Sequence, residues 1–477
     1  MIRFRFTGLS TLTLALGACS MAPKYVAPAP PVPVSWPVGD AYLAQSEAAL
    51  PLVSYTEIFR DRRLQSLVEQ ALTNNRDLRV AAANLAAARA QVRVVRANQF
   101  PAVGVNGSVT RTEAGSGSTT NGSGTNGTGD RTSYSVQGGI SSFELDFFGK
   151  YASATQAQRD TALSTEAAAR TVRLGLVADL AQAWANYAAD NDLLRIAQAT
   201  AANAERSVTL TSARLKGGVA PRTDLRQAEQ VLETARGDVA SQRTALAQDV
   251  NAIRLLVGAD FDQSLLPASV DEVNQSLAVL PAGTSSQVLL RRPDVVEAEY
   301  SLRAANADIG TARAELFPSI SLTGLLGFAS NALSALFDKG AFTASLGADA
   351  SWSIFNAGGR VANVDVAKAQ RDAALATYEK AIQTAFREVA DALADQGTLN
   401  ERMRAASRFT EAASDTARLT EASYRQGITS SLENLDAQRS LYSARQQEIA
   451  VRLAAASNRI TLYRVLGGDQ ATPASGQ

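Results

Sequence analysis

Histidine is absent from the 477-residue chain, and cysteine occurs only once. The usual zinc ligand sets are therefore excluded, as are serine–histidine and cysteine–histidine nucleophile pairs. The chain has 46 basic and 46 acidic residues, and a formal charge of zero leaves no electrostatic footprint for nucleic acid. Only 6% of the residues are aromatic. We expect long helices and no enzyme, metal site or nucleic-acid partner.

The first fifty residues carry signals for export and anchoring. Basic residues and an apolar stretch at 9–16 predict a removed signal peptide, 1–18. Leu-Gly-Ala-Cys, ending at Cys19, resembles the box at which bacterial lipoproteins are cut and acylated, so we expect a covalent lipid such as palmitate on Cys19. A lone thiol in an ordinary signal peptide is the alternative. Residues 19–50 then form a proline-rich, semi-rigid tether that spaces the body from the anchor.

The rest of the chain is a tandem repeat, because two halves show the same order of signals. Each half has a helical stretch, Leu64–Asn98 or Val295–Leu316, that ends at Phe-Pro and is followed by alternating segments and a long alanine-rich region. The predicted boundaries are 51–258 and 291–468 for the repeats, 259–290 for an equatorial linker, about 102–147 and 319–355 for the β-hairpins, about 150–256 and 360–466 for the helical hairpins, and 469–477 for a disordered tail.

The alanine-rich regions predict two very long helices, 151–216 and 361–426, without internal proline. About sixty residues at 1.5 Å each span roughly 90 Å, which no compact domain accommodates. Apolar residues recur every three or four positions, as in a coiled-coil seam. Each long helix turns at a glycine, and the returning helices are predicted to begin near Arg222 and Ser431.

The four alternating segments are predicted to be strands in a membrane. The Gly, Ser, Thr and Asn run at 115–129 cannot form a buried element and is predicted to be an outward, hydrophilic loop. Unpaired strand edges in lipid cost several kcal/mol per group, so strands there must close into a barrel of at least about eight. Four strands cannot close alone, and we expect two or more subunits to share one barrel. A soluble sandwich is the alternative.

Three long motifs carry a family resemblance. Leu289–Asp294 reads LLRRPD, Ala304–Gly310 reads AANADIG, and Phe317–Gly324 reads FPSISLTG. A fourth, FELDFFG at Phe143–Gly149, is similar to the family's strand-to-helix junction but begins with Phe instead of the usual Trp. Together they resemble the TolC-like outer-membrane efflux family in its lipoprotein branch, the OprM- and NodT-like outer-membrane factors, over Pro23–Gly468.

The resemblance implies a mixed α and β fold. A homotrimer would form one 12-stranded outer-membrane β-barrel, with four strands per chain, that continues into a long α-helical periplasmic barrel. Such a protein is the passive exit channel of a tripartite efflux system in the outer membrane of a Gram-negative bacterium. Its expected partners are outer-membrane lipid, a periplasmic adaptor (membrane fusion protein) and an inner-membrane pump, by resemblance the proton-driven RND type.

Other functions stay open at this point. They are a channel for polypeptide secretion, a coiled-coil surface scaffold without a pore, and a periplasmic enzyme such as a glycan hydrolase. Glu144 and Asp146, two apart, could form an acid–base pair, although a polar barrel-to-tunnel junction is the favoured explanation.

The resemblance also implies a periplasmic gate at the second helix tip. Residue by residue, Tyr424 matches an aromatic latch, Gly427 a tip glycine, and Glu433 with Asp436 an acidic pair in which Glu433 departs from the commoner Asp. Glu433 and Asp436, three apart, share one helix face. In a trimer six carboxylates would crowd one aperture, raising their proton affinity and attracting cations. Solvated first-turn carboxylates are the alternative.

At the first tip, Thr223 and Asp224 occupy the corresponding latch positions. The alternative for them is an N-terminal helix cap just after Pro221. The turns at both tips are expected to contact the adaptor. The residues are Gly217, Gly218, Val219, Ala220, Gly427, Ile428 and Thr429.

Overall fold

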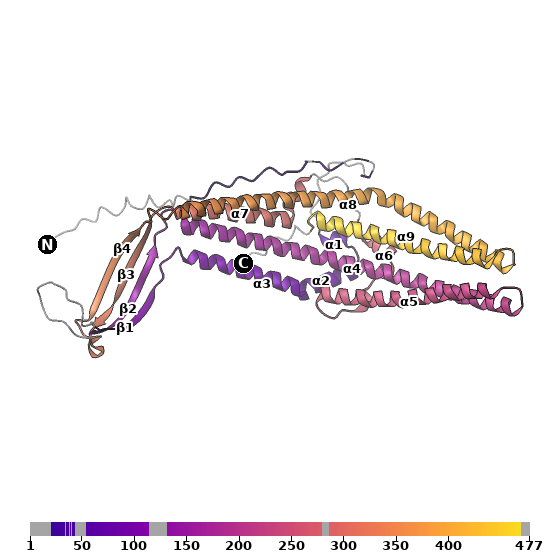
Figure 1. The fold of residues 1–477 in the computed structure, drawn as a ribbon, viewed down its shortest axis with the longest axis horizontal. Helices are drawn as coiled ribbons and strands as arrows, with labels where there is room; N and C mark the ends of the chain where they lie inside the picture. The colour runs from indigo at the N-terminus through magenta and orange to yellow at the C-terminus, as the bar shows by residue number, and fades with distance from the viewer. Residues whose placement is uncertain are drawn as a thin grey trace. The chain divides into compact units, whose positions relative to one another are not determined.

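The computed structural model describes residues 21–42 (34, 38 and 40 excepted), 54–113, 131–278 and 286–468. Cys19 and the predicted signal peptide, the loop at 115–129 and the tail lie outside the described residues. The elements are α1 (Tyr55–Ile58), α2 (Arg62–Asn74), α3 (Arg76–Ala97), β1 (Gly104–Thr112), β2 (Arg131–Glu144), α4 (Lys150–Lys216), α5 (Arg222–Val257), η1 (Gln263–Leu265), α6 (Val270–Ser276), η2 (Ser286–Arg291), α7 (Pro293–Ala314), β3 (Ser319–Ser330), η3 (Leu333–Ala335), β4 (Phe342–Ser351), α8 (Gly359–Arg425) and α9 (Ser431–Val465) (Figure 1).

Helices α4 and α8 are the longest elements, with 67 residues each. At 1.5 Å per residue each spans about 100 Å. Each is followed by a tight turn in which a glycine has positive φ, +73° at Gly218 and +80° at Gly427, a conformation that favours glycine because it has no Cβ. Across the described ranges, no helix combines the length and the apolar character needed to cross a bilayer.

The helix predicted over Leu64–Asn98 is in fact two helices, α2 and α3, which meet at Asn75. The backbone of Asn75 leaves the helical region, with ψ at 137°. Its side chain accepts hydrogen bonds from the backbone N–H groups of Asp77 and Leu78 and donates one to the carbonyl of Leu256, at 2.9 Å. The contact with α5 therefore explains a break that the helical pattern alone did not reveal.

The strands form one antiparallel sheet in the order β1-β2-β3-β4. Consecutive strands pair as two hairpins, and β2 pairs with β3 across the repeats. The register between β2 and β3 shifts between Ile140 and Phe143. A side chain at Gly327 would come within 2.2 Å of the carbonyl oxygen of Val136, so the sheet needs a residue without Cβ at this close approach.

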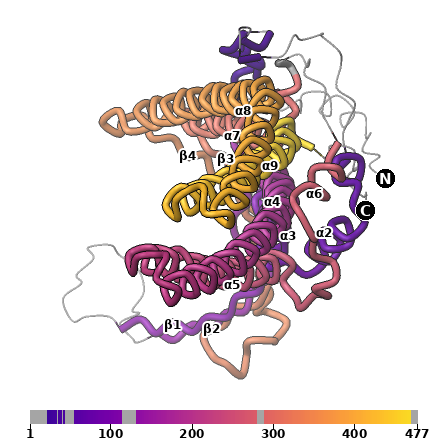
Figure 2. Tube along the Cα trace, turned by 90° about the vertical axis from the view of Figure 1, so that its right-hand side faces the viewer, coloured from indigo at the N-terminus to yellow at the C-terminus, as the bar shows by residue number. Residues whose placement is uncertain are grey.

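The contacts divide the chain into two compact units that cut across the repeats. The first unit, residues 1–28, 86–164 and 299–377, contains the sheet. The second, residues 29–85, 165–298 and 378–477, contains the turns of both helical hairpins, which lie at the same end of this unit (Figures 1 and 2).

Each unit has its own core. In the first, Ile309 packs with Val364 of α8, and the rings of Phe148 and Phe317 stack at 4.5 Å. In the second, the fully buried Trp184 of α4 donates its indole N–H to the carbonyl of Leu265 at 3.0 Å. This bond ties the linker between the repeats to the first long helix.

The described part of the segment after Cys19 is packed against helices, whereas the sequence predicted only an extended, semi-rigid tether and no surface for it to pack on. In the first unit, the carbonyl of Pro23 accepts a bond from Asn306 at 2.7 Å, and Arg303 covers the ring of Tyr25 at 5.0 Å. In the second unit, Trp36 is 3% exposed and stacks on Phe386 of α8 at 5.0 Å. Apolar side chains among the prolines give this segment a surface to bury, which explains the difference.

Candidate channel and periplasmic gate

The sheet has one apolar and one polar face, as the register shows. Residues paired directly across neighbouring strands lie on the same face, because successive side chains along a strand point to opposite sides. The apolar face carries Val105, Val109, Tyr134, Val136, Ile140, Ile320, Leu322, Leu326, Phe328, Phe342, Ala344, Leu346, Ala348 and Ala350, with the polar Arg111, Thr132 and Ser330 at one end. The opposite face is mostly polar and carries Asn106, Ser108, Thr110, Ser133, Ser135, Gln137, Ser321, Thr323, Thr343, Ser345 and Asp349, together with Leu325 and Ala329.

The apolar face is exposed, and its two outer strands have open edges. Leu346 of β4 is 90% exposed and Val105 of β1 is 75% exposed. Among the described strands, β1 pairs only with β2 and β4 only with β3. Open edges would be left unpaired in lipid, whereas strands from another copy would satisfy them. The sheet therefore has the pattern of one share of a transmembrane barrel.

Exposed aromatic residues lie at both ends of the hairpin formed by β3 and β4. At one end Phe328 packs edge-on against Phe337 and Phe342, with ring centroids 5.5 and 5.9 Å apart. At the other end Trp352 and Phe355 are exposed just after β4. Aromatic girdles at both interfaces are typical of membrane barrels.

Glu144 and Asp146 hold the start of α4. A carboxylate oxygen of Glu144 accepts the hydroxyl hydrogen of Tyr151 at 2.7 Å, and Asp146 accepts a backbone N–H bond from Ala152 at 2.8 Å. Burial, followed by the bond to Glu144, raises the pKa of Tyr151 to about 12. These bonds give both carboxylates a role in the polar junction between strand and helix.

Tyr424 joins α8 to α4 at the second tip. It is 4% exposed, and its hydroxyl lies 3.2 Å from the hydroxyl of Thr211. The guanidinium of Arg214 lies over the Tyr424 ring, 4.4 Å from its centroid, and donates to the Tyr424 carbonyl at 2.9 Å. Thr211 and Arg214 were not among the predicted residues. Both are polar residues inside a long helix, and nothing local marks them as partners of a tyrosine more than 200 residues away.

Glu433 and Asp436 are both exposed in the first turns of α9. Ser430 is the N-cap of this helix and accepts the backbone N–H of Glu433 at 3.2 Å. Asp436 forms an ion pair with Arg439, one turn further, at 2.8 Å. Arg439 was not among the predicted residues, although its i, i+3 spacing from Asp436 was a signal for it. It places a positive charge beside the acidic pair.

The first tip is built differently. Its returning helix, α5, has Pro221 as N-cap and no side-chain cap bond. Thr223 and Asp224 both lie inside the first turn and neither caps the helix through its side chain; Thr223 is exposed and Asp224 is half-buried. Within one subunit the structure brings Tyr424 together with Thr211, not with Thr223 or Asp224.

The turns of both tips expose apolar side chains. Val219 in the first turn is 76% exposed, and Ile428 in the second is 73% exposed. Gly217, Gly218 and Gly427 are exposed beside them, whereas Ala220 and Thr429 are half-buried. The predicted adaptor-contacting residues thus form two small exposed surfaces, one at each tip.

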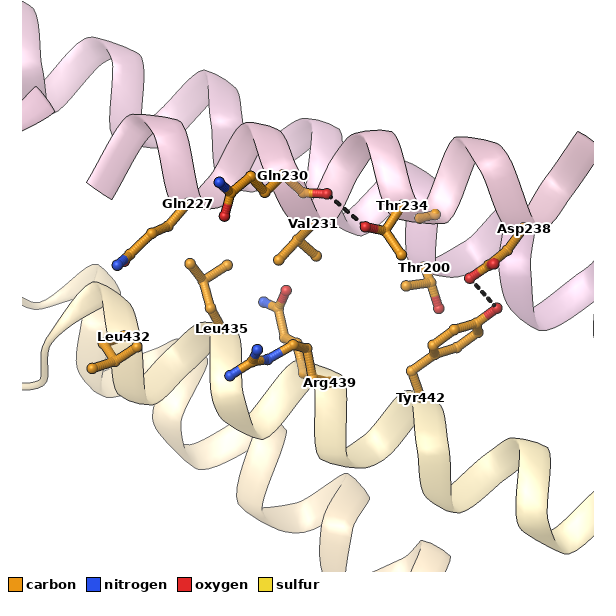
Figure 3. Close-up of a pocket in the computed structure, with 12 residues that line it drawn as sticks. Thr200, Gln227, Gln230, Val231, Thr234, Asp238, Leu432, Leu435, Arg439 and Tyr442 are labelled. Carbon is orange, nitrogen blue, oxygen red and sulfur yellow. Dashed lines mark hydrogen bonds between the residues drawn. The ribbon is translucent and has the colours of Figure 1, made fainter. Parts of the chain in front are cut away.

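Next to the tips, α5 and α9 line a partly open cavity of about 340 Å³ (Figure 3). Its walls mix aliphatic and neutral polar side chains with the charged Asp238 and Arg439, and Thr200 of α4 also contributes. The hydroxyl of Tyr442 on α9 donates to a carboxylate oxygen of Asp238 on α5 at 3.0 Å (Figure 3).

The comparisons with known proteins agree with this geometry. The family described as outer membrane efflux protein matches residues 67–259 and 284–468. The chain belongs to the outer membrane efflux protein family. The antibiotic efflux pump outer membrane protein ArpC of Pseudomonas putida is 42% identical over 463 residues, 96% of this chain and 94% of that protein. The cation efflux system protein CusC of Escherichia coli strain K12 is 39% identical over 458 residues, covering 96% of this chain and 98% of CusC.

The solved structures extend the likeness to three dimensions. The open state of the MtrE outer membrane channel of Neisseria gonorrhoeae is 33% identical, has a TM-score of 0.82, and covers 94% of this chain and 98% of that one. The fold class predicted from the sequence is therefore confirmed as that of the trimeric outer-membrane efflux channels. The protein is an outer membrane efflux protein of a Gram-negative bacterium that reaches into the periplasm.

Proposed function

We propose that three copies of this chain form one gated exit channel that receives solutes from a periplasmic adaptor and a proton-driven inner-membrane pump of the RND type. The amphipathic four-stranded sheet with two open edges carries this proposal. Four strands are too few to close a barrel, whereas three copies supply twelve and leave no edge in lipid. The polar face of Ser, Thr, Asn and Gln would then line the lumen.

The periplasmic mouth is closed in this proposal by contacts between the two helical hairpins of each subunit. Tyr424 supplies a hydroxyl bond to Thr211 and a cation–π contact with Arg214. Both contacts cross from α8 to α4, so the hairpins cannot separate at the tips without breaking them. Glu433 and Asp436 form an acidic ring around the mouth, partly balanced by Arg439.

The adaptor contacts the tips through Val219 and Ile428. Both aliphatic side chains are more than 70% exposed in turns, and exposed apolar residues rimmed by polar ones are typical of protein–protein contacts. Two such tips per subunit give a trimer six docking positions.

The lipid on Cys19 anchors the chain beside the barrel. Met21, two residues later, bonds through its carbonyl to Arg313 of α7 at 3.2 Å, within the unit that contains the sheet. The described chain two residues after Cys19 is therefore attached to the unit that contains the sheet. Two attachments, barrel and lipid, then hold the channel in the outer membrane.

The cargo that we propose is antibiotics and related organic solutes, because ArpC belongs to an antibiotic efflux pump. Metal cations are the second candidate, because CusC is a cation efflux protein of similar identity. The test is efflux of a preloaded dye, with susceptibility to antibiotics and to a panel of metal salts, in a deletion strain with and without this chain restored. Restored antibiotic resistance supports the first cargo, and restored metal resistance alone supports the second. No restoration of either, with the protein present as a trimer, contradicts the proposed export function.

A further inference from the structure

The helices α5 and α9 are poorly packed against each other over the stretch that encloses the cavity. About 340 Å³ of space separates them, walled by residues such as Val231 and Leu435 together with three glutamines (Figure 3). Because this cavity is partly open to solvent, the side chains that line it have fewer protein atoms to pack against than buried side chains have. Packing alone therefore holds these two helices together weakly.

One hydrogen bond crosses this weakly packed stretch. The Tyr442 hydroxyl donates to Asp238 at 3.0 Å, at one end of the cavity (Figure 3). Both side chains are half-buried, and burial, followed by the bond to Asp238, raises the pKa of Tyr442 to about 12. The phenol is thus a stable donor at physiological pH, and bonds to a charged acceptor are stronger than neutral ones.

We propose that Tyr442 and Asp238 form a second latch of the periplasmic mouth, an inference that rests on the gate proposed above. Tyr442 lies about 17 Å along α9 from its first residue, whereas Tyr424 lies at the end of α8. The two latches join different helix pairs, α9 with α5 and α8 with α4. Together they hold the hairpins at two levels, so that breaking one leaves the other to resist separation.

The cavity determines how this latch opens. When α9 moves away from α5, few packed side chains must separate along this stretch, because a cavity partly open to solvent already lies between the helices. The main interaction to be broken is the bond between Tyr442 and Asp238. Removing its hydroxyl should shift the ratio of closed to open mouths by about tenfold, as expected for a bond to a charged group.

The experiment is single-channel conductance of the purified full-length protein in planar lipid bilayers. Tyr442→Phe removes only the hydroxyl, and we expect its open probability to rise about tenfold over wild type. Asp238→Asn weakens the bond and should give a smaller rise. The double variant should match Tyr442→Phe, because the same bond is already lost.

Tyr151→Phe is the matched control. It also removes a bond from a tyrosine to a carboxylate, at 2.7 Å, and Tyr151 also has a pKa of about 12. That bond lies at the junction of strand and helix, within seven residues of sequence. Wild-type conductance in this variant, with increased opening in Tyr442→Phe, supports the latch.

The outcomes separate the latch from the proposed gate. If Tyr424→Phe opens the channel but Tyr442→Phe conducts like wild type, the second latch is wrong and the tip gate stands. If the wild-type trimer and every variant lack conductance, the exit channel itself is wrong. If Tyr442→Phe fails to form trimers, the conductance of Asp238→Asn tests the latch instead. Conductance equal to wild type in that variant overturns the proposal.

Discussion

The two helical hairpins have almost the same lengths, 67 and 36 residues in the first and 67 and 35 in the second, but different chemistry. The second turn has a side-chain cap at Ser430 and the buried Tyr424, whereas the first has Pro221 without a cap bond and the exposed Thr223. After duplication the geometry of the helices was kept while their polar contacts diverged. The second hairpin thus supplies the latch residue Tyr424, and the first hairpin supplies Thr211 and Arg214, which Tyr424 contacts.

The largest effect is expected when the latch is removed. Tyr424→Ala eliminates the bond to Thr211, the cation–π contact with Arg214 and a buried ring. We expect conductance in planar bilayers to rise more than tenfold, because several contacts are lost together. Thr223→Ala, the corresponding change at the first tip, should leave conductance at the wild-type level. Equal effects of both variants would contradict the asymmetry of the tips.

A smaller increase in conductance is expected when a residue of α4 that contacts Tyr424 is changed. Arg214→Gln removes the charge over the Tyr424 ring and weakens the bond to its carbonyl, while the Thr211 hydroxyl stays. A cation–π contact is worth about 0.5–2 kcal/mol, so opening should increase roughly fivefold. The control is Arg226→Gln, because Arg226 is exposed and pairs only locally with Glu229. Conductance unchanged in Arg214→Gln would restrict the latch to the Thr211 bond.

Local signals made the architecture predictable, but long-range partners were not predictable. Glycine ends α5 at Gly258, with φ at +74°, and such ends can be read from neighbouring residues. The break at Asn75 depends on a backbone carbonyl about 180 residues away, and the partners of Tyr424 are side chains about 210 residues away. Thr211 and Arg214 also fit a solvated helix face, so their sequence context gave no reason to select them.

The first helical hairpin contains a pair of neighbouring carboxyl groups that the second lacks. Asp249 on α5 and Asp190 on α4 are close enough for their carboxyl groups to affect each other's pKa. Burial, followed by the charge of Asp190, raises the pKa of Asp249 to about 7. Gly427 of the second hairpin corresponds to Gly218 of the first. With the same sequence offset, Asp190 corresponds to Leu399 and Asp249 corresponds to Asn458, and both of these residues are buried.

A raised carboxyl pKa stabilises the folded state most below the unfolded value near 4, and this contribution is lost as the pH rises through about 7. We therefore expect the melting temperature, followed by tryptophan fluorescence, to fall between pH 5 and pH 8. Asp249→Asn should flatten this dependence, since Asn can accept or donate without titrating. Asp260→Asn, at an exposed carboxylate of the linker, is the control. A wild-type slope in Asp249→Asn would show that the pair does not share a proton.

The smallest effect is expected at the cap. Ser430→Ala removes the bond from the Glu433 N–H, and loss of an N-cap costs about 1 kcal/mol. Hydrogen exchange in the first turns of α9 should then accelerate about fivefold, because 1.4 kcal/mol corresponds to tenfold. Pro221→Ala in the first hairpin removes no side-chain cap bond, so exchange in α5 should change less. If exchange rose equally in both helices, the cap would not distinguish the tips, and the asymmetry would depend on Tyr424 alone.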